Sequence, residues 1–180
     1  AGKAVVVVDE AYIEFCPQAT LAKELKNYPH LAIIRTLSKA FALAGLRCGF
    51  VLANAALIQI LSKVIAPYPI PVTSADIAEQ ALQAENIALV QARAQEILAN
   101  RQWLADALAD LPQVENVYHS EANYLLFKCQ DGERVFKALW EQGIILRDQN
   151  KALNLQNCIR ITVGTKKECE SVVEAIAILK

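Results

Sequence analysis

Residue types that can bind an anion or form a covalent bond lie close together around Lys39. Thr36 and Ser38 come just before the lysine, and Arg47 follows in the same stretch. Because the residues that flank Lys39 are small or apolar, we expect its amine to point into a shielded site, where burial favours the neutral, nucleophilic form of an amine. The two hydroxyls and the guanidinium can bind an anion beside it. This stretch therefore predicts a lysine nucleophile next to an anion site.

Asp9 is a second residue with possible chemistry. It ends the apolar run of residues 4–8, and taken alone such an aspartate is more often a turn or helix-cap residue. If the run is a sheet strand, the carboxylate can face the same crevice as Lys39, because open α/β sheets gather ligands at strand ends. An amine, an anion site and a carboxylate in one pocket suit a phosphorylated aldehyde.

Short strands are expected to position these groups. Residues 31–34 and 46–52 are apolar, and the gap between them is shorter than the crossover of about a dozen residues that parallel pairing needs, so we expect them to pair antiparallel. Residues 4–8 are mostly β-branched, which is typical of a strand buried on both faces of a parallel sheet. Residues 20–27 fit a short helix that completes a right-handed β-α-β unit.

The middle of the chain is predicted to be helical. Residues 55–64 form one expected helix, after which prolines at 67, 69 and 71 keep the chain extended and remove their amide donors. Ser74 is expected to cap residues 75–111, which are rich in good helix formers. We divide that segment into two helices with a break near Asn86.

After Pro112 the pattern indicates a compact α/β module. Gly143 lies where a helix needs a left-handed stop, and Thr165 with Glu168 forms a capping box. Overall we predict an α/β fold with a boundary at the prolines, giving domains at residues 1–73 and 74–180. The expected elements of the module are strands at 114–118, 124–128, 144–146 and 158–163, a helix around 135–140 and a final helix after 165.

Composition excludes several classes of protein. The 180 residues are 54% hydrophobic and 21% charged, which allows a sizeable core. A net charge of −1 gives no electrostatic reason to expect nucleic acid or an anionic membrane as a partner, and no apolar run reaches the ~18 residues of a membrane span. The two histidines are far apart, so we expect no metal. Five cysteines without a C-x-x-C pair indicate thiols in a reducing cytoplasm.

Four segments of the chain carry a family resemblance. Thr36-Leu37-Ser38-Lys39-Ala40-Phe41-Ala42-Leu43-Ala44-Gly45 resembles the lysine signature of class II aminotransferases of the fold type I pyridoxal-phosphate family. Val8-Asp9-Glu10-Ala11-Tyr12 resembles the Asp-x-x-Tyr motif that precedes it there. Residues 143–148 and 158–165 are also similar, and the match runs from residue 1 to 180.

The resemblance implies how the two domains correspond to such an enzyme. Residues 1–73 would be the remnant of the large cofactor-binding domain, with part of its mostly parallel sheet. Residues 74–180 would be the bridging helices and the small α/β domain. The chain would be the carboxyl-terminal half of a longer protein, an expectation that the absence of methionine and a start close to a core strand also favour.

The resemblance further implies pyridoxal 5'-phosphate as the cofactor. Lys39 would condense with its aldehyde and act as the base and acid that moves the proton. Asp9 would pair with the pyridine nitrogen, and Tyr12, otherwise a core aromatic, would hydrogen-bond the phenolic oxygen. The cofactor phosphate would be held by hydroxyl and guanidinium groups: Ser38, Arg47 and, as a further candidate, Thr36.

Two arginines of the second domain are implied substrate ligands. Arg160, which without the resemblance could equally be a surface ion pair, would clamp the substrate carboxylate, and Arg147 would help with a substrate phosphate. Within the family the motifs are most similar to the branch of histidine biosynthesis that acts on histidinol phosphate and 2-oxoglutarate or glutamate. The resemblance also implies that the full-length protein is a homodimer.

Two alternatives remain open from the sequence. One is a related enzyme, such as a threonine-phosphate decarboxylase or another amino-acid aminotransferase. The other is a non-catalytic aminotransferase-like domain of a transcription regulator, although nothing here is basic enough for DNA contact. Because the glycine-rich phosphate loop and the ring-stacking aromatic lie upstream in the family, we expect the isolated chain to be weak or inactive.

Overall fold

The computed structural model describes residues 4–179, which divide into two compact units between residues 94 and 95. The long helix α3 (Ala84–Ala109) runs through this division. The domain boundary that the sequence predicts between residues 73 and 74 stays a prediction.

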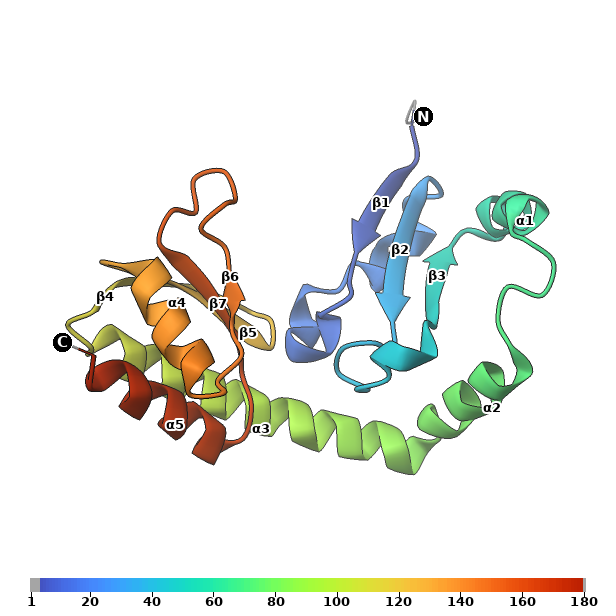
Figure 1. The fold of residues 1–180 in the computed structure, drawn as a ribbon. Helices are drawn as coiled ribbons and strands as arrows, with labels where there is room; N and C mark the ends of the chain where they lie inside the picture. The colour runs from blue at the N-terminus through green and yellow to red at the C-terminus, as the bar shows by residue number, and fades with distance from the viewer. Residues whose placement is uncertain (1–3, 180) are drawn as a thin grey trace. The chain divides into compact units, whose positions relative to one another are not determined.

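The first unit is built on a three-stranded sheet in the order β1 (Val6–Asp9), β2 (Leu31–Thr36), β3 (Gly49–Ala53) (Figure 1). The first two strands are parallel, with Asp9 opposite Ile34. The last two are antiparallel, with Thr36 opposite Gly49. The predicted antiparallel pairing is confirmed, and the ends of β1 and β2 that lead to Asp9 and Lys39 lie at the same edge.

The connection from β1 to β2 differs from its prediction. The helix expected at residues 20–27 is instead the last of three short 3-10 turns: Ile13–Phe15, Pro17–Ala19 and Ala22–Lys26. Glu24 N–H bonds to the Leu21 carbonyl, and Asn27 N–H to the Glu24 carbonyl, both in the tighter i to i+3 pattern. The Leu21 amide, just before the last of these turns, bonds to the Glu10 carboxylate.

The prediction that β1 is buried on both faces is wrong. Val6 is 49% exposed and Val7 is 55% exposed, whereas Ile33 of the central strand is fully buried. β1 is also an edge of the described sheet and pairs only with β2. The small core of this unit includes Ile13, Phe15, Leu31, Ala32, Ile33 and Leu37, and Val90 and Ala94 of α3 are buried as well.

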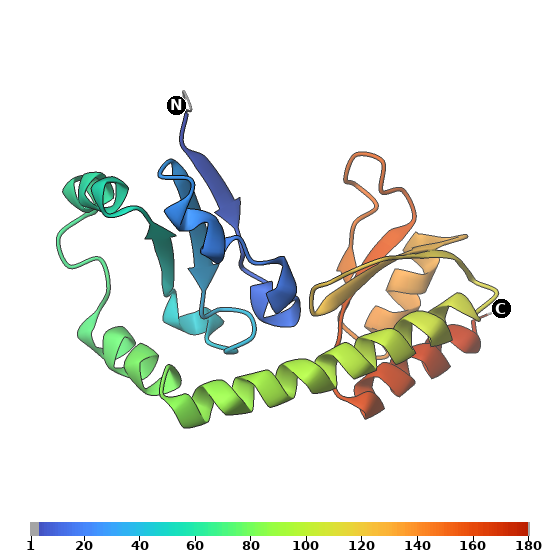
Figure 2. The ribbon, with the colours of Figure 1, turned by 180° about the vertical axis from the view of Figure 1, so that it is seen from behind.

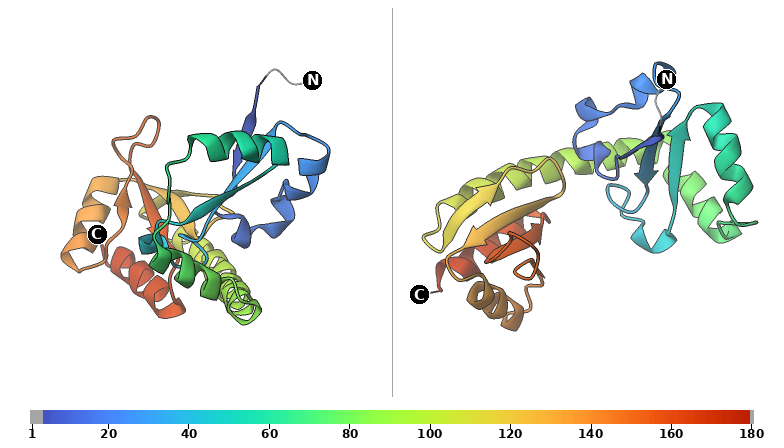
Figure 3. Two further views of the ribbon diagram at one scale, coloured as in Figure 1. Left: turned by 90° about the vertical axis from the view of Figure 1, so that its right-hand side faces the viewer. Right: turned by 90° about the horizontal axis from the view of Figure 1, so that it is seen from above.

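The helices of the middle segment largely follow the sequence pattern. Helix α1 (Ala55–Val64) has the predicted bounds, is capped by the Asn54 side chain and lies beside β3 (Figure 3). Helix α2 (Val72–Ala81) begins directly after Pro71, so Ser74 lies inside the helix and does not cap it. The predicted break occurs between α2 and α3, slightly before Asn86.

The second unit contains a four-stranded antiparallel sheet with helices on one face (Figure 2). Along β5 every second residue is buried (Leu125, Phe127 and Cys129), which is the alternation of a strand with one packed face. These residues share a core with side chains of α3, α4 and α5. The strands are, in sheet order, β4 (Val114–Tyr118), β5 (Tyr124–Cys129), β7 (Cys158–Thr162) and β6 (Arg147–Asp148), and the helices are α4 (Gly132–Glu141) and α5 (Lys166–Ala177).

The end of helix α4 explains why the strand predicted at residues 144–146 does not form. Gly143 has φ of 77°, the left-handed stop that was predicted, and the Ile144 amide then bonds back to the Leu139 carbonyl. Ile144 is therefore bonded to the end of α4, residues 144–146 form no strand, and β6 is only two residues long. The capping box of Thr165 and Glu168 is confirmed at the start of α5. Among residues 4–179, no helix is both long and apolar enough to cross a membrane.

Candidate active site

Asp9 ends β1 at the edge of the sheet from which the Lys39 loop leaves β2. Its Oδ1 accepts a hydrogen bond of 2.9 Å from the amide of Ala11, which shapes the turn after the strand. The Asp9 residue is exposed. Its carboxylate therefore has the turn role that the sequence suggests and is also open to a ligand.

Lys39 and Tyr12 are brought together by the two loops that leave these strands. The Lys39 Nζ lies 5.1 Å from the centroid of the Tyr12 ring, a cation–π distance. The prediction that the Lys39 side chain lies in a shielded site is wrong for the described residues, because Lys39 is exposed. The residues next to it in sequence, Ser38 and Ala40, are small and only partly exposed. The amine is accessible, and Tyr12 is its nearest aromatic partner.

Thr36 and Ser38 form a hydroxyl network before the lysine. Thr36 Oγ1 lies 2.8 Å from Ser38 Oγ and 3.2 Å from the carbonyl oxygen of Cys48, and it accepts a 3.1 Å hydrogen bond from the Ser38 amide. A hydroxyl has only one proton to donate. When Thr36 donates to Ser38, Ser38 keeps its own proton for an outside acceptor. The pair is therefore arranged to offer a donor to an anion.

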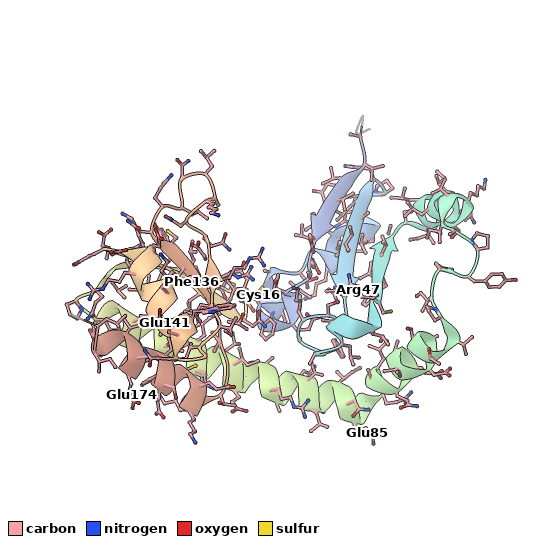
Figure 4. All side chains as sticks on the ribbon, in the orientation of Figure 1. Cys16, Arg47, Glu85, Phe136, Glu141 and Glu174 are labelled. Carbon is pink, nitrogen blue, oxygen red and sulfur yellow. The ribbon has the colours of Figure 1, made fainter. Side chains whose placement is uncertain are left out.

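Arg47 lies where the loop turns into β3 (Figure 4). It has φ of 55°, a left-handed conformation that costs a non-glycine residue about 1–2 kcal/mol. Its Nη1 donates a 2.9 Å hydrogen bond to the carbonyl of Ala44. The residue is exposed, so its other donors can reach an anion.

Arg147 and Arg160 are cross-strand neighbours in the second unit. They lie directly opposite one another on β6 and β7. The Arg160 guanidinium is 5.1 Å from the centroid of Tyr124, and its Nε is buried without a hydrogen-bond partner among residues 4–179. Two like charges in directly opposed positions and an unsatisfied buried donor favour binding of an anion here.

The structure also shows a buried ionic group that the sequence reasoning missed. Glu10 is 6% exposed and accepts hydrogen bonds from Arg35 Nε (3.1 Å) and Nη2 (2.9 Å), from the Leu21 amide (2.8 Å) and from Thr20 Oγ1. Burial raises the pKa of Glu10, but these hydrogen bonds and the Arg35 charge together hold it below the ordinary value. The sequence alone does not indicate this pair, which follows from the parallel register: Asp9 is opposite Ile34, so Glu10 comes next to Arg35.

Glu14 has the opposite electrostatic environment four residues later. Burial raises its pKa, and its Oε2 is buried without a hydrogen-bond partner among the described residues. A hydrogen bond from its own backbone and the nearby charge of Arg35 both lower the pKa, but burial outweighs them. The two glutamates of this loop therefore differ, since Glu10 is paired with Arg35 and Glu14 Oε2 has no partner among the described residues.

The residues of the first unit match the chemical groups of a phosphorylated pyridine aldehyde. An accessible amine can take up the carbonyl, a carboxylate can face a protonated ring nitrogen, and the hydroxyl network with a guanidinium can bind the phosphate. The unpaired Arg160 Nε supplies a separate anion-binding group in the second unit. Arg160 is therefore suited to bind an anionic group of a substrate.

Comparisons with known proteins agree with this chemistry. The family model for aminotransferase class I and II matches residues 1–176. Histidinol-phosphate aminotransferase 1 of Haemophilus influenzae is 79% identical over all 180 residues, which make up 49% of that protein. The chain thus spans about half the length of the curated relatives it matches, and which half it represents stays a prediction.

Solved structures of aminotransferases have a similar fold to this chain. The histidinol-phosphate aminotransferase from Clostridium acetobutylicum has a TM-score of 0.87 at 24% identity, covering 96% of this chain and 53% of that one. The enzyme from Sinorhizobium meliloti, solved in complex with pyridoxal-5'-phosphate, has a TM-score of 0.80 at 26% identity, covering 96% and 48%.

Proposed function

The chain belongs to the class I and II aminotransferases, which depend on pyridoxal phosphate, and we propose that it carries the lysine-bearing part of an enzyme that interconverts histidinol phosphate and 2-oxoglutarate with imidazole-acetol phosphate and glutamate. The observation that carries this proposal is the approach of Lys39 Nζ to Tyr12 beside the strand that ends in Asp9. The 79% identity to a histidinol-phosphate aminotransferase supports the choice of substrate.

The cofactor, when bound, supplies an aldehyde that takes up amines and a protonated ring that withdraws electrons. Asp9 would pair with the ring nitrogen and keep it protonated, and the Tyr12 hydroxyl would donate a hydrogen bond to the phenolic oxygen. Lys39 Nζ holds the proton that moves during the reaction. Ser38 and Arg47 would bind the cofactor phosphate directly. Thr36 would act indirectly, through its hydrogen bond to Ser38.

The arginines of the second unit bind the substrate in this proposal. Arg160 pairs with the carboxylate of the amino donor and accommodates the phosphate of histidinol phosphate, and Arg147 assists with that phosphate. Their opposed positions on β6 and β7 and the unsatisfied Arg160 Nε support these roles. An Arg160→Lys change keeps the charge but loses the fork geometry that suits both anions.

The cofactor assignment is tested by covalent trapping. Pyridoxal phosphate is added to the 180-residue chain, the mixture is reduced with borohydride, and the labelled peptide is identified by mass spectrometry. We expect the label at Lys39, and an unlabelled peptide in the Lys39→Arg control. Labelling of the exposed Lys63 to the same extent as Lys39 would overturn the assignment.

The substrate assignment is tested by reconstitution. The chain is expressed together with the half of the Haemophilus influenzae relative that it does not match, and turnover is compared with that of the chain alone. We expect transamination of histidinol phosphate only in the reconstituted protein, which we propose is a cytoplasmic homodimer; the five free cysteines support a reducing compartment. Decarboxylation of threonine phosphate in place of transamination would identify a related enzyme instead.

A further inference from the structure

The buried pair of Glu10 and Arg35 connects the two segments that carry the proposed catalytic groups. Glu10 directly follows Asp9, and its amide continues the parallel ladder by bonding to the Ile34 carbonyl at 2.8 Å. Arg35 directly precedes Thr36 on β2. The pair therefore lies one position from Asp9 on one segment and one position from the hydroxyl network on the other.

Strand geometry places this pair behind the proposed site. Successive side chains of a strand point to opposite faces, so Arg35 faces away from Ile34 and Thr36. The parallel register sets Glu10 opposite Arg35, and both side chains turn to the covered face, with exposures of 4% and 23%. Asp9 shares the other face with Thr36. The sheet therefore lies between the Glu10–Arg35 pair and the face that carries Asp9 and Thr36.

The pair also fixes the loop that leads away from Asp9. Thr20 Oγ1 accepts a 2.9 Å hydrogen bond from Arg35 Nη2 and donates to the Glu10 carboxylate, which in turn holds the Leu21 amide. Two guanidinium nitrogens of Arg35 converge on Glu10 Oε2, and the Leu21 amide bonds to Oε1, so both carboxylate oxygens of Glu10 are held in place. A shift of Glu10 would carry Asp9 with it, and a shift of Arg35 would carry Thr36.

We propose that Glu10 and Arg35 are positioning residues that fix the distance between the Asp9 carboxylate and the Lys39 amine by tying the ends of β1 and β2 together. The role of the distance rests on the proposed function, whereas the mechanical coupling of the two loops does not. Neither residue touches the reacting atoms. Their contribution is to keep the two loops from moving independently.

The test measures that coupling without any cofactor. Amide hydrogen exchange is followed in the 180-residue chain for Leu21, on the Glu10 side, and for Ser38 and Leu43, which are hydrogen-bonded in the Lys39 loop. In Arg35→Met and Glu10→Gln we expect exchange to rise about tenfold at all three amides. Glu133→Gln, which breaks an exposed 2.7 Å ion pair on α4, is the matched control and should change none of them.

A second measurement connects the coupling to the proposed chemistry. The ratio of pyridoxal-phosphate label at Lys39 to label at Lys63 should fall about tenfold in Arg35→Met and partly recover in Arg35→Lys, which restores the charge without the fork. Faster exchange at Leu21 alone, with Ser38 and Leu43 unchanged, would overturn the positioning role. A wild-type chain that fails to label Lys39 would instead count against the proposed function, while the exchange result would still decide the coupling.

Discussion

The two units of this chain bury very different shares of their apolar residues. In the second unit, Phe127, Leu139 and Ile159 are fully buried in one continuous core. In the first unit, Val6 and Val7 remain about half exposed although they form a sheet strand. The unit that carries the proposed cofactor residues is therefore the one with the smaller core. The comparison teaches that an apolar pattern predicts a strand but not the element that covers it.

The largest effect is expected from a substitution that creates a cavity in the core of the second unit. Phe127→Ala removes a fully buried ring and should lower the free energy of unfolding of the second unit by about 3–5 kcal/mol. Denaturation followed by hydrogen exchange resolves the loss unit by unit. A loss below about 1 kcal/mol would show that the second core is less closely packed than its burial indicates.

Glu10 should show the largest single effect in the first unit. Its pKa is held below the ordinary value by its hydrogen bonds and Arg35, so its carboxylate stabilises the folded state above the ordinary glutamate pKa. Glu10→Gln should cost about 2 kcal/mol at pH 7. The difference from wild type should disappear as the pH falls through the ordinary glutamate range and the lowered pKa, which a series of denaturation curves would show. A loss that is independent of pH would contradict an ionic role.

Glu14 should behave in the opposite way. Because burial raises its pKa, the folded state is penalised at pH values above the ordinary glutamate pKa, where the unfolded chain ionises more readily. Glu14→Gln should therefore raise the stability of the first unit at pH 7, by about 0.5 kcal/mol. The gain should vanish at acidic pH, where the carboxyl is protonated in both states. Reduced stability at pH 7 would show that Glu14 has an ionic partner.

The smallest effect is expected at the exposed strand. Val6→Thr keeps the β-branched shape at a residue that is 49% exposed, so the stability of the first unit should change by no more than about 0.5 kcal/mol. Val172→Thr, at a buried position of α5, is the matched change in the second unit and should be clearly destabilising. Equal effects of the two changes would remove the contrast between the units.

Local rules were sufficient to predict much of this fold from the sequence. The antiparallel pairing of β2 and β3 follows from the short gap between them, and the left-handed Gly143 and the capping box of Thr165 follow from local helix-end chemistry. The chemically important stretch around Lys39 was recognisable because hydroxyls, an arginine and a lysine are close in sequence.

The features that were missed depend on contacts between distant residues. The exposure of Lys39 and β1 depends on which elements cover them, and no local pattern encodes that. The Glu10–Arg35 pair joins residues 25 positions apart, and it could be inferred only once the parallel register was known. The segment at residues 22–26 also makes a contact that no local pattern predicts, because the Leu21 amide just before it bonds to Glu10 across the loop.

The exposed valines of β1 have a practical consequence for handling the chain. Within the described sheet, β1 presents one row of backbone donors and acceptors that no strand pairs with, beside the exposed side chains of Val5, Val6 and Val7. Such an edge is a template for strand addition by another copy and for amyloid-like aggregation. We therefore expect the isolated chain to aggregate as its concentration rises. Val7→Lys, which places a charge on the edge strand, should restore solubility.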